Sequence, residues 1–257
     1  MEIQRDRYGR PLVIPPGGSK PVAYTRTTTI AGSLDDASAL IAWKMRMACI
    51  GLSQRPDLLL AVAATDKTDN KAINALVEEA MEASGANAAA RIGSAVHAMT
   101  EKMDRGETIE AVPEPYIGDL RAYAAATSIF TNRFIEQFTV LDEYKIAGTP
   151  DRVVEYNGEL YISDLKTGSL HPSSVAMQLS IYSRALPYDI ATGERGTFGP
   201  VNQDRGIIVH LPAGKATCEL HWVDLKEGWE GVQLAMKARK WRDQKGLTTP
   251  FEEGNDG

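Results

Sequence analysis

The chain has 257 residues, of which 43% are hydrophobic and 24% charged, an ordinary globular composition with room for one large domain or two small ones. No apolar run has the length of a membrane span, and the polar N-terminus does not predict a secretory signal. Two cysteines, Cys49 and Cys218, exclude a disulfide framework or a four-cysteine metal site and favour a reducing cytosolic setting. The net charge of −6 argues only mildly against nucleic-acid binding, because net charge does not report a local patch.

The N-terminal half is predicted to be helical. Residues 1–32 are rich in Pro, Gly and Thr without a clear period, and we expect them to form an extended arm. Helices are expected after that arm, on the basis of cap residues and of apolar residues at helical spacing. They cover residues 33–50, a short segment from Pro56, and residues 69–83, 87–103 and 113–138.

The C-terminal half changes character and predicts strands. Strands are expected at 140–146, 150–156, 160–166, 205–211 and 217–223, the last two as a hairpin, with helices at 172–186 and 224–244. An acidic tail, residues 247–257, is expected to be flexible. The sequence thus predicts a single α/β domain over 33–246, whose helical part, 33–138, packs on a small sheet.

The stretch 148–166 contains the strongest local signal in the chain. Asn157 and Gly158 separate two runs rich in β-branched and apolar residues, which predicts a tight hairpin because both turn residues must adopt positive φ. With a two-residue loop, the pairing of facing positions runs outward from the turn until Asp151 faces Asp164. The sequence therefore predicts that two carboxylates share one face of the sheet.

The chemistry of that pair follows from its spacing. Facing Cβ atoms lie about 4.5–5.5 Å apart, so two carboxylates repel each other unless a divalent cation, which prefers oxygen ligands, lies between them. Lys166 lies two residues beyond Asp164 on the same face. Hydrolysis of a phosphodiester needs this set, because a metal polarises the phosphate and acidifies a bound water while an ammonium stabilises developing charge. A solvated hairpin with scattered charges is the alternative.

Two helices supply further candidates. Gly93, His97 and Glu101 are four residues apart and share one face of an alanine-rich helix, where a glycine suits close approach to a sheet or a ligand and a neutral imidazole can bind a metal. The alternative is a packed histidine that pairs with Glu101. Gln178 and Tyr182 share a face of a later helix, either to contact a phosphate or base or as ordinary helix surface and core.

Four motifs, taken in order, resemble the RecB-like branch of the PD-(D/E)XK nuclease superfamily. They are Arg91-x-Gly93-x-x-x-His97-x-x-x-Glu101, Gly148-Thr149-Pro150-Asp151, Asp164-Leu165-Lys166-Thr167-Gly168 and Gln178-x-x-x-Tyr182. Each motif is weak alone, but their order and the thirteen-residue step from Asp151 to Asp164 match that branch over residues 90–185. The resemblance implies a restriction-endonuclease-like core, a small central mixed sheet flanked by helices, over residues 87–223.

The resemblance also implies a role for each matched position. His97, Asp151, Asp164 and the carbonyl of Leu165 would hold Mg²⁺ or Mn²⁺, and a mixed imidazole and carboxylate set suits both ions. The catalytic residues would be Asp151, Asp164 and Lys166. Gln178 and Tyr182 would bind DNA. Glu101 and Arg91 are expected beside the ligands, where Glu101 would support them or contribute to a second ion.

The number of cysteines distinguishes this chain from some members of the branch. Some of its members, including the CRISPR-associated exonucleases, carry an iron–sulfur cluster on four cysteines, and two cysteines cannot build one. The chain therefore resembles the compact phage-encoded exonucleases of the branch, which act in DNA replication, recombination or repair. That likeness implies that the protein acts in the cytoplasm of a phage-infected bacterium, away from membranes, on linear duplex or single-stranded DNA. It also implies a recombinase or single-strand-binding protein as a candidate partner, and it is compatible with an oligomer.

Other functions stay open on the sequence alone. An endonuclease or nickase would use the same site, a non-catalytic DNA-binding assembly subunit would keep the fold, and a small phosphate ester or RNA would suit similar chemistry. The intact Asp151, Asp164 and Lys166 set argues against the non-catalytic subunit. The remaining histidines, His171, His210 and His221, match no motif and are interpreted as structural.

Overall fold

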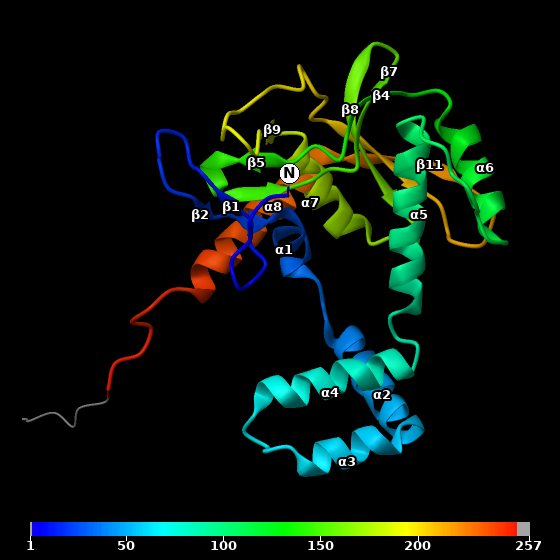
Figure 1. Cartoon of the computed structure of the whole chain (residues 1–257). Helices are drawn as coiled ribbons and strands as arrows, with labels where there is room; N and C mark the ends of the chain where they lie inside the picture. Colours follow the sequence, from blue (N-terminus) through cyan, green and yellow to red (C-terminus); the bar gives the residue numbers. More distant parts are fainter. Residues whose placement is uncertain (1, 251–257) are drawn as a thin grey trace, which may run out of the picture.

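The computed structural model describes residues 2–250 and shows a mixed α/β fold, as the sequence predicts (Figure 1). Most of the predicted flexible tail, residues 251–257, lies outside the described residues. The central sheet has five strands in the order β11 (Glu219–Asp224), β10 (Arg205–His210), β8 (Glu159–Lys166), β7 (Arg152–Tyr156) and β4 (Thr131–Ile135). It is mixed, because β10 runs parallel to β8 while the other neighbours are antiparallel.

A second sheet lies beside the first and incorporates the N-terminal segment. Its four strands are, in order, β3 (Thr25–Arg26), β6 (Ile146–Gly148), β5 (Thr139–Leu141) and β9 (Leu186–Pro187), and a separate pair is formed by β1 (Leu12–Val13) and β2 (Val22–Ala23). The predicted strand 140–146 is therefore two strands, separated by a 3₁₀ turn at Asp142–Tyr144.

Parts of the segment predicted as an extended arm, residues 1–32, pack into the fold. Val13 and Tyr24 are fully buried, and β3 pairs with β6. The short helix α1 (Thr27–Ala31) then packs Ile30 into a cluster with β6, α7 (Pro172–Tyr182) and α8 (Leu225–Arg242). Burial of these side chains makes the N-terminal segment part of the core.

Helix α7 is the central helix of the molecule. Its Val175 and Leu179 pack on the five-stranded sheet, while Met177 and Ile181 pack against α1 and α8. Helix α8 follows Asp224, where the predicted helix starts, and the Asp224 side chain accepts from two backbone N–H groups of the first turn. Helix α7 ends at Tyr182 rather than at the predicted residue 186, because the chain turns there into β9.

Two helices cover the opposite face of the central sheet, α5 (Ala88–Asp104) and α6 (Tyr116–Thr127). Val96 of α5 and Tyr123 of α6 pack there against apolar side chains of β7, β8 and β10. The predicted helix over 113–138 is wrong in its second half, which forms β4. Phe130 and Phe134 lie four apart, as in a helix, but a bulge near Asn132 breaks the alternation that would have revealed the strand.

The remaining helices form a separate lobe. It comprises α2 (Ser38–Gln54), α3 (Pro56–Ala64) and α4 (Asn70–Ala83), and we call these helices the helical lobe and the rest of the described chain the body. The lobe stands away from the sheets at the lower end of α5 (Figure 1). A Cβ at Gly51 of α2 would lie 1.7 Å from the carbonyl oxygen of Ala80 in α4, so these helices cross in backbone contact.

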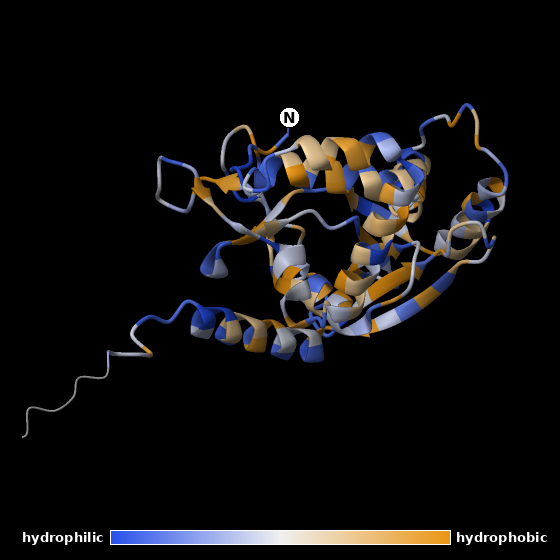
Figure 2. Cartoon of the chain, turned by 90° about the horizontal axis from the view of Figure 1, so that it is seen from below, coloured by the Kyte–Doolittle hydropathy of each residue, from blue (hydrophilic) through white to orange (hydrophobic). Residues whose placement is uncertain are grey.

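Apolar side chains are unusually exposed on the lobe. Seen from the lobe's side, its helices carry many hydrophobic residues (Figure 2), and the large exposed ones are Leu40, Ile41, Met45, Ile50, Leu59, Leu60 and Val77. None of the helices within residues 2–250 is long and apolar enough to cross a membrane.

Candidate active site

The hairpin formed by β7 and β8 has the predicted register. Tyr156 pairs with Glu159 and the ladder continues to Arg152 opposite Ser163, with Asn157 and Gly158 at positive φ in the turn. Asp151 lies one residue beyond this ladder. Its Oδ2 accepts a hydrogen bond of 2.8 Å from the backbone N–H of Leu165, the residue after Asp164, so the two acidic residues occupy neighbouring positions at the end of the hairpin.

Asp164 is held by side chains from its own strand and from α7. It is 2% exposed, and the Lys166 ammonium lies 2.5 Å from its Oδ2. Its Oδ1 accepts a hydrogen bond of 3.1 Å from the amide of Gln178, whose oxygen lies 3.4 Å from Lys166 Nζ. Gln178 therefore connects the acid and the amine.

His97 approaches the same point from α5. Its Nδ1 lies 3.5 Å from Asp151 Oδ2. Burial lowers the pKa of His97, against the opposing pull of Asp164 and of the Leu165 carbonyl. The imidazole is thereby kept neutral near pH 7, which is the form that binds a metal.

Burial dominates the electrostatics of the carboxylates. Burial first, and then the charge of Asp151, raise the pKa of Asp164 to about 6 against the opposing charge of Lys166. Burial likewise raises the pKa of Asp151, against the N–H of Leu165 and the charge of Lys166. Two buried acids with raised pKa values form a site in which added positive charge is strongly favoured.

These residues suit a divalent cation. Asp164 Oδ2 is a buried oxygen without an aligned hydrogen bond in the described chain, because Lys166 is close to it but not in hydrogen-bond geometry. An oxygen in this state normally has a partner. Two carboxylates, a carbonyl and a neutral imidazole together form the mixed donor set that Mg²⁺ or Mn²⁺ accepts.

A cleft of about 680 Å³ opens beside the site, along α5. It is lined by His97, Glu101, Glu136 and the Thr167-Gly168 segment that follows β8. Glu136 escaped the sequence analysis because it lies directly after β4, in the region mispredicted as helix. Burial first, and then the charges of Asp151 and Glu101, raise its pKa to about 7, so the cleft holds a carboxyl group that titrates near neutrality.

A buried ion pair fixes α5 beside the site. Arg152, the first residue of β7, donates from Nε to Asp104 Oδ2 at 2.6 Å, and the same oxygen accepts from the Tyr123 hydroxyl at 2.6 Å. Arg152 also donates to the carbonyl of Asp151. The last residue of the His97 helix is thus bonded to the strand that begins beside Asp151, a contact that sequence analysis missed.

Two glycines of the predicted motifs are explained by close contacts. A Cβ at Gly93 would lie 2.8 Å from Thr167 Oγ1, so the glycine lets α5 approach the end of β8, as expected. A Cβ at Gly148 would lie 2.6 Å from Thr27 Oγ1 and 2.9 Å from the Tyr182 hydroxyl. The second contact explains why β6 needs a glycine where it passes α1 and α7.

Two predicted site residues differ in where they lie. Tyr182 is 2% exposed, its hydroxyl lies against Gly148, and burial together with the charges of Asp164 and Asp151 raises its pKa, so it lies beside the acids. Arg91 forms an exposed ion pair with Glu82 of α4, which directs it toward the helical lobe and away from the acids. Glu101 lines the cleft one turn after His97 and pairs with Arg105 at 2.9 Å.

Comparison with known protein families agrees with this geometry. The model of the PD-(D/E)XK nuclease superfamily matches residues 62–196, just over half of the chain. The chain belongs to the PD-(D/E)XK nuclease superfamily. No curated protein matches the chain.

Membership in the superfamily sets the general activity. These proteins are nucleases that hydrolyse DNA with the aid of divalent metal ions, so the chain is a nuclease-type hydrolase with DNA as its substrate and a divalent cation as its cofactor. The matched segment contains all of the acids, the lysine and the histidine described above.

Proposed function

We propose that the chain is a metal-dependent DNA exonuclease of the RecB-like branch, similar to the phage-encoded members and acting in DNA replication, recombination or repair. The observation that carries the proposal is the convergence of Asp151, Asp164, Lys166 and His97, from one hairpin and one helix, on a single buried point. The exonuclease mode rests on the order of the four motifs, which resembles that branch.

Each residue has a proposed task. His97, Asp151, Asp164 and the Leu165 carbonyl hold Mg²⁺ or Mn²⁺. When bound, the cation supplies Lewis acidity that polarises the phosphate and makes a water more acidic. Glu101 and Glu136 line the cleft beside these ligands and support them or a second ion.

Lys166 is the residue proposed to act on the reacting atoms. Water attacks phosphorus, the bond from phosphorus to the leaving oxygen breaks, and that oxygen gains a proton. The Lys166 ammonium orients the water and stabilises negative charge on the phosphate oxygens. Gln178 positions the ammonium and Asp164 together, since its amide reaches both, and it contacts the DNA strand where the cleft opens.

The proposed domain is larger than the sequence predicts. We place the nuclease domain at residues 2–246, since α1 packs with α7 and α8 and the N-terminal strand β1 packs with β5 and β6. A recombinase or single-strand-binding protein remains the proposed partner, and the bacterial cytoplasm the proposed location.

The first experiment follows cleavage of end-labelled linear duplex, single-stranded DNA and covalently closed circular DNA in Mg²⁺, Mn²⁺ or EDTA. We expect metal-dependent release of nucleotides from linear DNA, with the circle intact, because an exonuclease needs an end. Relaxation or linearisation of the circle would instead establish an endonuclease or nickase.

Two variants test the site residues, and a third serves as a control. Asp164→Asn and Lys166→Met should each reduce the cleavage rate by at least about 100-fold, as expected for loss of a group that stabilises transition-state charge. Arg91→Ala, which removes an exposed pair away from the acids, should cleave at the wild-type rate. DNA binding without cleavage under every metal would contradict the catalytic proposal and favour a non-catalytic assembly subunit.

A further inference from the structure

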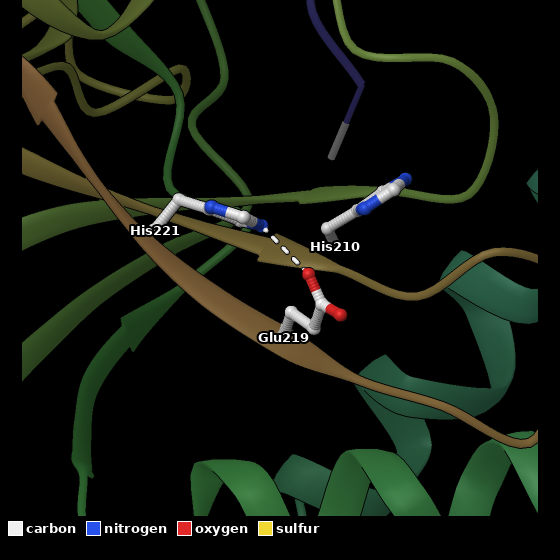
Figure 3. Close-up of side chains that lie close together, drawn as sticks. All are labelled: His210, Glu219 and His221. Atoms are coloured by element: carbon white, nitrogen blue, oxygen red, sulfur yellow. Dashed lines mark ion pairs between the residues drawn. The ribbon is translucent and has the colours of Figure 1, made fainter.

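A second cluster of metal-ligating side chains lies on the hairpin at the other edge of the central sheet. It consists of His210 on β10 with Glu219 and His221 on β11, and we call it the hairpin cluster. One ligand atom from each residue lies within 4.8 Å of the others. In Figure 3 the His221 ring and the Glu219 carboxylate point toward each other, with the His210 ring beside them.

The sheet register explains why the three side chains meet. His210 pairs directly with Glu219, and His221 pairs with Ile208, two residues earlier on β10. Positions two apart on a strand share a face, so all three side chains rise on the same side of the hairpin. This arrangement depends on pairing between strands and leaves no spacing motif in the sequence, which is why the sequence analysis interpreted both histidines as structural.

The His210 ring is already oriented like a metal ligand. Its Nε2 lies 3.0 Å from the carbonyl oxygen of Gly168. A carbonyl accepts a hydrogen bond, so Nε2 carries the proton and Nδ1 is left with a free lone pair. Histidines that bind metals usually donate the other ring N–H to a backbone carbonyl or a carboxylate in this way.

His221 provides the second independent observation. Its Nε2 is buried and has no hydrogen-bond partner among the described residues. The nearest acid, Glu219 Oε2, lies 3.4 Å away without hydrogen-bond alignment. A buried nitrogen without a partner is costly, and a cation between the two groups would satisfy both.

We propose that the hairpin cluster is a binding site for a transition-metal dication, with Zn²⁺ as its representative. Two imidazoles and one carboxylate suit such ions, whereas Mg²⁺ prefers oxygen ligands alone. Three protein ligands leave the fourth tetrahedral position to water. Metal–ligand bonds of about 2.0–2.2 Å place ligand atoms roughly 3.3 Å apart, and Glu219, whose side chain is exposed, is free to close the remaining distance.

The ion would brace the loop that follows the catalytic lysine. His210 pairs with Lys166 across the parallel β10–β8 ladder, and its ring bonds to Gly168, two residues after that lysine. A metal on Nδ1 would fix the His210 ring and, through Nε2, the Thr167-Gly168 segment that lines the active-site cleft. The site is separate from the acids of the proposed function and does not depend on them.

The test measures zinc bound per chain, on the full chain, by gel filtration and elemental analysis. Metal-free protein is given excess Mg²⁺, to occupy the oxygen-rich site, and is then titrated with Zn²⁺. We expect the wild type and Asp164→Asn to retain a tightly bound Zn²⁺ that Glu219→Gln and His221→Gln lose. The loss should exceed the roughly 10–100-fold reduction in affinity that removal of an outer hydrogen-bond partner causes.

Two controls keep the outcome clear. His171→Gln changes an exposed histidine on the segment before α7 and should bind zinc like the wild type. Circular dichroism in EDTA should be the same for all variants, and Glu219→Gln, being exposed, carries the test if His221→Gln does not fold. Equal zinc binding by the wild type and Glu219→Gln, or zinc lost only in Asp164→Asn, would overturn the proposal.

A second measurement tests whether the bound ion restricts the motion of the Thr167-Gly168 segment. Hydrogen exchange at residues 167–171 should slow when Zn²⁺ is added to the wild type, and should not change in Glu219→Gln. Unchanged exchange in a wild-type protein that has bound zinc at the hairpin cluster would refute the coupling to the cleft.

Discussion

The body and the helical lobe differ in how they bury apolar side chains. In the body, Ile162 and Leu179 are fully buried between the central sheet and α7. In the lobe, Leu60 is 73% exposed and Met45 is 65% exposed, and few side chains are buried where the three helices meet. Burial of apolar surface provides most of the stabilisation of a fold, so the body forms a stable unit and the lobe opens more easily.

The residues of the proposed active site lie in the well-packed body and not in the helical lobe. The groups of the proposed site come from β8, α5 and α7 and from residues next to β4 and β7, all in the body. The lobe is joined to the helix that carries His97 by the chain, because α5 follows α4 directly, and by the exposed ion pair of Arg91 with Glu82. The site residues are therefore held by well-packed elements of the body, whereas the loosely packed helices α2, α3 and α4 carry none of them.

The largest effect is expected for Asp104→Ala in the body. Removal of this acid leaves the buried Arg152 guanidinium without its closest acidic partner and with only the more distant Glu136, 3.7 Å away, which costs about 3–5 kcal/mol in the free energy of unfolding. Urea denaturation measures this change. Arg91→Ala, which breaks an exposed pair at the lobe, should change the free energy of unfolding by less than about 1 kcal/mol. Equal losses of stability in the two variants would contradict the proposed difference in stability between the body and the lobe.

A smaller and more local effect is expected for Gly51→Ala. The added methyl group meets the Ala80 carbonyl and must separate α2 from α4, at a cost of about 1–3 kcal/mol typical of overpacking. Hydrogen exchange should accelerate in α2, α3 and α4 while the sheets keep their protection. Ser53→Ala, an exposed change in the same helix, is the control, and uniform acceleration through the body would show that the lobe and body unfold together.

The third prediction concerns pH and the acids of the cleft. Glu136 has a pKa raised to about 7 in the folded protein, so the fold binds its proton more tightly than the unfolded chain does. Its stabilising contribution is present below pH 4.5 and is lost as the pH rises toward 7. In EDTA, Glu136→Gln should therefore be more stable than the wild type at pH 8, by about 1 kcal/mol after allowance for its partial exposure, with no gain at pH 4.

Thermal denaturation at the two pH values checks this prediction. Glu107→Gln provides a matched change at an exposed acid away from the cleft and should show no such pH-dependent gain. A variant of Glu136 that is less stable than the wild type at pH 8 would mean that its charge has a favourable partner, and would contradict the raised pKa.

The smallest effect is expected at the exposed apolar surface of the lobe. Leu60→Ala should change the free energy of unfolding by no more than about 0.5 kcal/mol, as surface substitutions do. Leu58→Ala, in the same helix but 3% exposed, should destabilise the lobe by about 2 kcal/mol or more. Similar values for the two leucines would show that the exposed face is covered in solution.

Local signals made much of the fold predictable. The Asn157-Gly158 turn determined the register of β7 and β8, which the structure confirms to the pair Arg152 and Ser163. The predicted helix starts at Asp69 and Asp224 are likewise confirmed, and in the structure both residues cap α4 and α8 with their side chains. These features depend on a few adjacent residues, so they are visible in the sequence.

Contacts between distant segments escaped prediction for a physical reason. Strands β1, β2 and β3 have two residues each, too few for any period. The pair of Asp104 and Arg152 joins residues 48 apart, and the hairpin cluster depends on pairing across strands. Such contacts form only in the folded chain and leave no local pattern in the sequence. Glu136 was not predicted as a site residue, because the four-residue spacing of Phe130 and Phe134 predicted a helix where β4 lies.

Helix α5 has the geometry of a lever. Its 17 residues span about 25 Å, with Ala88 at the lobe and Asp104 anchored to Arg152 in the body. His97 lies a little under half of the way from the anchored end to the lobe end. Rotation of the whole helix about that anchor would displace the imidazole by somewhat less than half of the movement of Ala88, and the contacts of Val96 and Gly93 with the body oppose such a rotation.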